Sequence, residues 1–164
     1  MPARSTRATA ALDRLGVTYV LHRYVVAEKV GDGYGEAVAA AIGLPGARVL
    51  KTLVVEVDGT PVVAVVPVTA RLSTRLLARA AGAKRAEMVA PSVAERLTGY
   101  VTGGISPFGQ KRRLNLYVDS SVLGHETVAV SGGVRGTQLE VSPQDLIGVT
   151  TATVAALVDD INRR

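Results

Sequence analysis

The chain has 164 residues, 48% of them hydrophobic, which is enough apolar material to bury the core of one domain without disulfides. It has no cysteine, which excludes thiolate nucleophiles and cysteine-ligated zinc, and its two histidines, His22 and His125, argue against a histidine-rich metal site. No apolar run approaches the roughly 20 residues of a membrane-spanning helix, and residues 1–16 lack the apolar centre of a signal peptide. We therefore expect a single cytoplasmic domain over residues 1–164, with no metal, cofactor or membrane partner.

Basic residues outnumber acidic ones, 19 to 14, and the excess is clustered. Lysine and arginine occupy all three positions of 111–113, and five more cations fall within residues 71–85. Such clusters favour a polyanionic partner, although the same residues would also suit solvated helix faces. With five tyrosines, one phenylalanine and no tryptophan, the chain has too few aromatic residues for a platform that stacks single-stranded nucleic acid.

Apolar periodicity, caps and turns predict a mixed α/β (α+β) domain. Ser5 or Thr6 can cap a first helix that Gly16 ends, and Asp58-Gly59 between two valine-rich runs predicts a β-hairpin. The expected helices are 5–16, 36–43, 72–82, 90–99, one that starts at Ser142, and 151–162, and the expected strands are 17–24, 49–57, 61–68, 114–119, 127–131 and 137–142. We expect a single mixed or barrel-like sheet of about six or seven strands, surrounded by helices.

Three common motifs do not fit. Residues 43–52, GLPGARVLKT, resemble a phosphate-binding P-loop, but Leu50 stands where that motif needs a glycine before the Lys-Thr pair. The glycines of residues 31–35 open no long βαβ unit, which weakens a dinucleotide interpretation. No G-x-S-x-G sequence offers a serine nucleophile.

Lys51 interrupts the pattern of its strand. With a period of two, Lys51 shares a face with Val49, Leu53, Val55 and Val57, where it is the only charge. One interpretation is a lysine at a strand end, whose stem covers apolar neighbours while its ammonium reaches water. The other is an ammonium in an apolar cleft, where it would face a substrate carbonyl, carboxylate or phosphate.

Three loops could converge on such a cleft: residues 98–109 (TGYVTGGISPFG), residues 131–136 (SGGVRG) and the segment around Tyr34. Glycines allow close approach of a ligand and leave backbone N–H groups free to donate. Each loop alone would be an ordinary tight turn. Together with Lys51, and without a usual nucleophile, they indicate a site built from backbone donors.

Four runs in order resemble the YbaK/EbsC family of aminoacyl-tRNA deacylases: KTLVVEVDG from residue 51, GAKRAEMVAP from 82, RLTGYVTGGISPFGQKRRL from 96 and VSGGVRG from 130. The similarity extends from residue 11 to about residue 148. The family is related to the editing insertion domain of bacterial prolyl-tRNA synthetases. The resemblance implies a trans-acting enzyme whose partner is the acceptor end of aminoacyl-tRNA, with prolyl-tRNA synthetase as a candidate second partner and no role for DNA.

The resemblance also implies the site residues. Lys51 matches the family's essential lysine, and the loop from Gly103 to Pro107 would lie against the terminal adenosine of tRNA. Phosphates near that adenosine would be met by Lys111, Arg112 and Arg113. The remaining substrate-binding or tRNA-binding positions are Tyr24, Tyr34, Thr52, Gly104, Ile105, Ser106, Ser131, Gly132 and Gln138.

The YbaK branch implies release of cysteine from tRNA(Pro), with the substrate thiol attacking its own carbonyl. Lys51 could stabilise the oxyanion, assist the leaving oxygen or position the nucleotide. Gln138 is a departure, because this branch usually carries Asp in that segment; the amide keeps hydrogen bonding and loses the charge. The alternatives are release of alanine, serine or threonine with water as nucleophile, and a non-catalytic module that holds the tRNA acceptor end.

Overall fold

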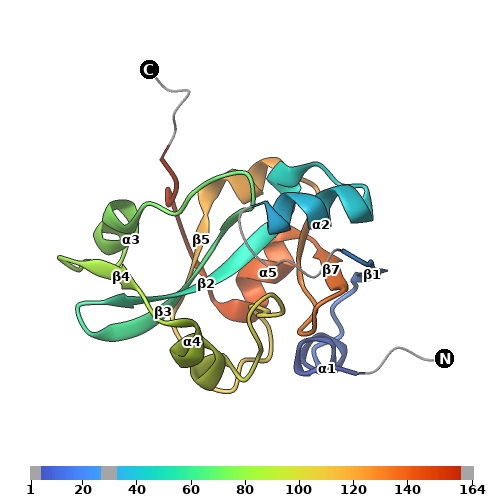
Figure 1. Ribbon diagram of the computed structural model, residues 1–164, viewed down its shortest axis with the longest axis horizontal. Helices are drawn as coiled ribbons and strands as arrows, with labels where there is room; N and C mark the ends of the chain where they lie inside the picture. The colour runs from blue at the N-terminus through green and yellow to red at the C-terminus, as the bar shows by residue number, and fades with distance from the viewer. Residues whose placement is uncertain (1–4, 27–32, 160–164) are drawn as a thin grey trace.

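Two β-sheets form the centre of the domain in the computed structural model, which describes residues 5–26 and 33–159 (Figure 1). The larger sheet has the strand order β4-β2-β3-β5-β8 and the smaller one β1-β7-β6. The strands are β1 (Val20–Arg23), β2 (Leu50–Val57), β3 (Thr60–Pro67), β4 (Ala86–Met88), β5 (Leu116–Asp119), β6 (Val128–Ser131), β7 (Thr137–Val141) and β8 (Thr153–Ala155). An isolated parallel bridge between Val49 and Ala129 joins the two sheets.

Five α-helices and two short 3-10 helices surround the sheets in the described residues. They are α1 (Arg7–Arg14), α2 (Tyr34–Ile42), η1 (Gly46–Arg48), α3 (Thr74–Ala80), α4 (Pro91–Thr98), η2 (Ser120–Gly124) and α5 (Pro143–Thr150). None of the described helices is long and apolar enough to cross a membrane. The expected α+β class is confirmed, with the strands divided between two sheets.

Local signals explain most of these elements. Thr6 caps α1, Ser73 caps α3 and Ser142 caps α5, each by accepting a hydrogen bond from a backbone N–H in the first turn. Asp58 and Gly59 have φ values of 45° and 85°, the left-handed conformation that a two-residue hairpin loop requires between β2 and β3. The capping residues and the hairpin were therefore readable from the sequence.

The helix predicted at 151–162 is wrong over the described residues. The segment instead forms β8, which pairs in parallel with β5, and Val158 then makes an isolated bridge with Leu72. Thr151 adopts a left-handed φ of 52°, which ends α5, and β-branched residues favour the extended chain that follows. Residues 160–162 lie outside the described residues.

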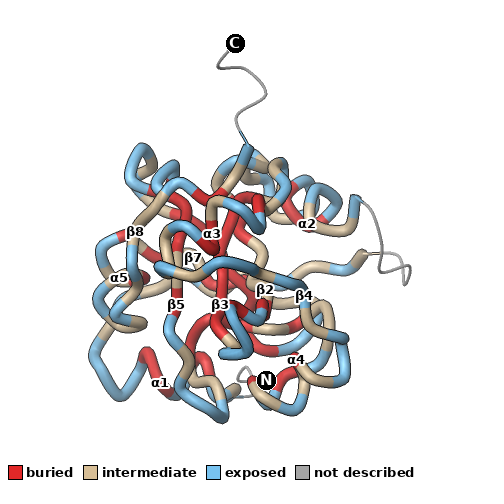
Figure 2. The backbone as a smooth tube through the Cα atoms, turned by 90° about the vertical axis from the view of Figure 1, so that its left-hand side faces the viewer, coloured by how far each residue is buried: buried red, intermediate tan, exposed pale blue. Residues whose placement is uncertain are grey.

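The strand β3 is buried on both faces and divides the core (Figure 2). Val63 and Val65 pack toward the smaller sheet, together with Phe108 and Leu139. The alternate residues of β3 pack instead against α3 and the C-terminal segment, in a cluster that includes Leu77. This position holds β2, the neighbour of β3, firmly in the centre of the molecule.

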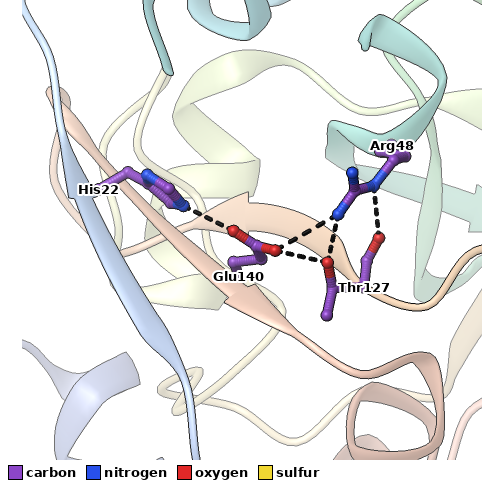
Figure 3. Close-up of polar contacts among 4 residues, drawn as sticks. All are labelled: His22, Arg48, Thr127 and Glu140. Carbon is purple, nitrogen blue, oxygen red and sulfur yellow. Dashed lines mark hydrogen bonds and ion pairs between the residues drawn. The ribbon is translucent and has the colours of Figure 1, made fainter. Parts of the chain in front are cut away.

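Glu140 connects the smaller sheet to the start of β2 in the larger one (Figure 3). Its carboxylate accepts hydrogen bonds from His22 Nε2 at 2.8 Å, from the Thr127 hydroxyl at 2.5 Å and from Arg48 Nη2 at 3.3 Å. Arg48 Nε also donates to the Thr127 carbonyl at 2.9 Å. Because Arg48 ends η1 just before β2, this network fixes the entrance of β2 relative to β7.

Glu140 should stabilise the fold in a pH-dependent way. The hydrogen bonds from Thr127 and His22 and the charge of Arg48 lower the pKa of Glu140. A lowered folded-state pKa contributes stability above the ordinary carboxyl pKa, and this contribution is lost as the pH falls through the lowered value. We expect Glu140→Gln to reduce the free energy of unfolding at neutral pH and the deficit to shrink in acid, measured by urea unfolding across pH. Glu126→Gln, at an exposed position, should show no deficit, and a Glu140→Gln deficit that stays constant with pH would contradict the assignment.

Candidate functional site

The strand β2 has one open edge near its start. It pairs with β3 along its whole length, but with β4 only over residues 55–57. The Val89 N–H donates to the Val54 carbonyl at 3.4 Å, so the backbone groups of Val54 point to the β4 side. By strand alternation, the N–H and C=O of Thr52 point to the same side, beyond the end of β4. Unpaired backbone donors and acceptors at a strand edge are available to a ligand.

A cavity of about 410 Å³ lies along this open edge, a size typical of small-molecule sites. Its walls come from β2, the first turn of α2, the start of α4 and the ends of β6 and β7. Of the residues predicted from the sequence, the structure brings together here Tyr34, Lys51, Thr52, Gly103, Ile105, Ser131 and Gln138.

Three residues that line the cavity each have a buried side-chain atom without a hydrogen-bond partner: Tyr34 Oη, Thr52 Oγ1 and Gln138 Oε1. No other side-chain nitrogen or oxygen in the described residues is in that state. Buried polar groups are nearly always paired in proteins, since an unpaired one costs about 1–3 kcal/mol. Because all three belong to residues around one cavity, this cavity is the candidate ligand site.

Lys51 is the one cation among the described residues that line the cavity, and it is half-buried in the first half of β2. Burial lowers the pKa of Lys51, the nearby positive charge of Arg71 lowers it further, and the carboxylate of Glu36 partly offsets both. No ion pair within 4.0 Å joins Lys51 to an acid in the described residues. The ammonium is therefore poorly solvated and available to a ligand oxygen.

Tyr34 begins α2 and Tyr24 follows β1, and the two rings belong to one apolar cluster with Val38. Burial raises the pKa of Tyr34 to about 12, and the polar hydroxyl of the neighbouring Tyr24 adds to the shift, although no hydrogen bond of normal geometry joins the two hydroxyls. Tyr34 is thus a neutral phenol that can donate or accept a hydrogen bond in the cavity. Tyr24 is not on the cavity wall and stands behind Tyr34.

Two neighbouring glycines of the 98–109 loop, Gly103 and Gly104, accommodate the 131–136 loop. Arg135 Nε donates to the Thr102 carbonyl at 2.9 Å. A Cβ at Gly103 would approach Arg135 Nε to 2.8 Å, and one at Gly104 would approach the backbone of Val134 and Arg135 to 3.1 Å. The absence of a side chain at these two glycines therefore lets the two loops pack closely, in addition to exposing the backbone. Arg135 lies across the loop beside the cavity.

The second half of the same loop belongs to the core. Ser106 is fully buried, and Phe108 packs in the cluster between the sheets. Tyr100 Oη donates to the Phe108 carbonyl, and Gln110 Nε2 donates to the Ser106 carbonyl at 2.9 Å. Ser106, Pro107, Gly104 and Gly132 are therefore buried beside the cavity and are not on its walls.

The three consecutive cations are exposed and are not on the cavity walls. The N–H groups of Lys111 and Arg112 donate to the carbonyls of Thr98 and Leu97 at 2.8 and 3.1 Å. These bonds hold the cations at the C-terminal end of α4, while Pro91 and Ala94 at its beginning line the cavity. At a rise of 1.5 Å per residue, the distance along α4 from Pro91 to its C-terminal end, where the cations are held, is roughly 10 Å.

Two charged residues at the cavity were missed by the sequence analysis. Glu36 lines it from the first turn of α2, and Arg135 lies beside Gly103. Glu36 directly follows the Tyr-Gly pair that begins the helix, so its position next to a predicted site aromatic was the available signal. Arg135 lay inside the quoted SGGVRG run, but nothing in the sequence indicated where its side chain points.

The comparisons with known proteins agree with this geometry. Residues 32–149 match the family described as aminoacyl-tRNA editing domain, and this match shows that the chain belongs to that family. The chain is 37% identical over 123 residues to an Enterococcus faecalis protein, across 74% of this chain and 75% of that one; its assigned name, itself provisional, is Cys-tRNA(Pro)/Cys-tRNA(Cys) deacylase EbsC.

Two further similarities point to the same family. The proline–tRNA ligase of Geobacter sp. (strain M21) is 31% identical over 105 residues, which are 64% of this chain and 18% of the ligase. A crystal structure described as a candidate trans-editing enzyme for prolyl-tRNA synthetase superposes with a TM-score of 0.81 at 25% identity, covering 94% of this chain and 96% of that one.

If the unpaired hydroxyl of Thr52 exists for a ligand, removing it should not harm the ligand-free fold. We expect Thr52→Val to keep or raise the free energy of unfolding, by up to about 1 kcal/mol, in urea titrations. Thr98→Val is the matched control, because the Thr98 hydroxyl donates to the Ala94 carbonyl and accepts from the Tyr100 N–H; it should cost about 1–3 kcal/mol. Equal losses for the two variants would show that Thr52 has a structural partner.

Proposed function

We propose that this member of the aminoacyl-tRNA editing domain family is a trans-editing deacylase that releases cysteine mistakenly attached to tRNA(Pro). The cavity along β2 would hold the aminoacyl group and the terminal adenosine. The observation that carries the proposal is the set of three unpartnered polar atoms around a single half-buried lysine. An aminoacyl ester has hydroxyl, carbonyl and amine groups that would pair with such a set.

The chemistry proposed uses the substrate's own nucleophile. The cysteine thiol attacks the ester carbonyl, the C–S bond forms, the bond from that carbonyl to the ribose oxygen breaks, and the thiol proton ends on the departing ribose. A nearby thiol gains greatly from proximity. The cavity walls in the described residues carry no cysteine or histidine, and the Ser131 hydroxyl accepts from the Gly133 N–H at 3.3 Å, so no Cys-His or Ser-His pair on these walls competes with this route.

The roles of the walls follow from their chemistry. Lys51 and the Thr52 N–H would stabilise the charge that develops on the carbonyl oxygen or on the leaving ribose oxygen. The hydroxyls of Tyr34 and Thr52 would pair with ribose or acyl oxygens. The backbone of Gly103 and Ile105, which line the cavity, would face the adenosine, and the cations at 111–113 would meet phosphates farther along the acceptor strand.

We propose that Gln138 influences which amino acid is released. Its Oε1 is buried and unpaired, and it can accept a hydrogen bond but brings no negative charge. Release of alanine with water as nucleophile is the second candidate function, since a neutral amide at this position suits an uncharged reaction partner. The names of the relatives favour cysteine, because the Enterococcus protein is named for Cys-tRNA(Pro) and Cys-tRNA(Cys).

Release of labelled amino acid from Cys-tRNA(Pro), Ala-tRNA(Pro) and Pro-tRNA(Pro) tests the proposal. We expect wild type to release cysteine fastest, and Lys51→Ala to lower the rate constant by roughly 100-fold or more while tRNA binding changes little, as for loss of one oxyanion-stabilising group. Faster release of alanine would move the protein to the water-dependent reaction. No release of any of the three, with tRNA still bound, would contradict the enzyme proposal and favour a module that only holds the acceptor end.

The cations at 111–113 should act on affinity and leave the chemistry unchanged. Each phosphate contact that is lost should reduce the slope of log affinity against log salt by roughly one unit. We therefore expect the variant with alanine at Lys111, Arg112 and Arg113 to bind tRNA more weakly with a flatter salt dependence and an unchanged rate at saturation. Arg14→Ala, at an exposed position of α1, is the control. An unchanged salt slope in the triple variant would exclude these phosphate contacts.

A further inference from the structure

Among the described residues that line the cavity, Glu36 is the one carboxylate and Lys51 the one cation. It lies in the first turn of α2 with an exposed side chain, and so belongs to the rim of the cavity. The two charges influence each other, since Glu36 raises the pKa of Lys51. They are nevertheless not paired within 4.0 Å, so neither charge is neutralised by direct contact with the other.

The position of Glu36 is fixed by close packing. A Cβ at Gly35 would approach Val68 Cγ1 to 2.5 Å, so the first turn of α2 lies directly on the segment after β3. Within β3 itself, Val66 pairs with Lys51 of β2. The carboxylate and the ammonium are therefore held on two elements that are packed against each other through residues 66–68, and Val68 itself lines the cavity.

An aminoacyl ester offers two recognisable features, an ester carbonyl and an α-ammonium group. Lys51 repels the ammonium and attracts the developing negative charge, so the carbonyl belongs on its side. The ammonium needs an acceptor, and Glu36 is the only charged acceptor among the described residues that line the cavity. A hydrogen bond between two charged groups is stronger than one to the neutral amide of Gln138.

We propose that Glu36 binds the α-ammonium of the aminoacyl group and so orients the ester carbonyl toward Lys51. This inference rests on the proposed function, because it assumes that the cavity takes an aminoacyl ester. It adds a specificity: acyl groups that lack a free amine, such as those of N-blocked or peptidyl esters, are poor ligands. The charge that Gln138 lacks is supplied from a different element, α2.

Binding of stable amide analogues tests this without depending on turnover. The probes are 3′-(cysteinylamino)-3′-deoxyadenosine and its deamino counterpart, 3′-(3-mercaptopropionylamino)-3′-deoxyadenosine, titrated by calorimetry. We expect wild type to bind the amine-bearing probe roughly 10- to 100-fold more tightly than the deamino probe, the range for a hydrogen bond to a charged group. In Glu36→Gln this ratio should fall to near one, and Glu36→Asp should recover part of it.

Two controls separate recognition from a structural effect. Glu56→Gln makes the same charge change at an exposed position of β2 that is not on the cavity walls, and should keep the wild-type ratio. The preference of wild type for the amine-bearing probe should decline as the pH rises past the α-amino pKa of about 8, and Glu36→Gln should show no such decline.

Two results would overturn the inference. One is an unchanged ratio in Glu36→Gln. The other is that Gln138→Leu abolishes the preference for the amine-bearing probe while Glu36→Gln preserves it. That result would assign binding of the ammonium to Gln138. If wild type binds the amine-bearing probe with the expected preference but releases no amino acid from any tRNA, the proposed reaction fails and the role of Glu36 stands. If wild type releases cysteine while Glu36→Gln keeps the preference for the amine-bearing probe, the proposed reaction stands and the role of Glu36 fails.

Discussion

The unequal pairing of β2 is the constraint on which the rest of the site depends. One edge of this strand is hydrogen-bonded to β3 throughout, while the other is covered by β4 only over its last three residues. A strand that is buried centrally and also open at one edge can present backbone and side-chain groups to a ligand without losing its place in the sheet. Lys51 and Thr52 lie on this open stretch, and the cavity follows it.

The neighbouring elements hold the opposing walls at fixed positions. Arg48, Thr127 and Glu140 connect the entrance of β2 to β7, which carries Gln138 two residues before Glu140. Close contacts at Gly103 and Gly35 allow the loop walls and α2 to approach the cavity. The site is built on packed strands and helix starts, as catalysis by orientation and preorganised charge requires.

The site costs the protein stability. Three buried polar atoms lack partners, and burial and Arg71 both lower the pKa of Lys51, which means that the folded state disfavours its charged form. Such local violations of the packing rules are expected where function requires them. Their confinement to one cavity, in a chain whose other described buried side-chain polar atoms are paired, makes the site recognisable.

Much of this was readable from the sequence, because it depends on local signals. The capped helices, the Asp58-Gly59 hairpin and the isolated charge of Lys51 in a valine-rich strand all follow from short-range patterns. The short strands β4 and β8 did not, since three residues carry too little periodicity, and the tail forms a strand only because β5 offers it an edge. Likewise the burial of Ser106 and the cavity position of Glu36 depend on contacts between distant segments.

The most direct test of the central claim is a crystal structure with a stable amide analogue of cysteinyl adenosine. The account predicts the acyl group along the open edge of β2, with its carbonyl oxygen within hydrogen-bond distance of Lys51 Nζ. It also predicts that Tyr34 Oη, Thr52 Oγ1 and Gln138 Oε1 gain hydrogen-bond partners from the ligand. An analogue bound elsewhere, or bound in the cavity with these three atoms still unpaired, would contradict the account.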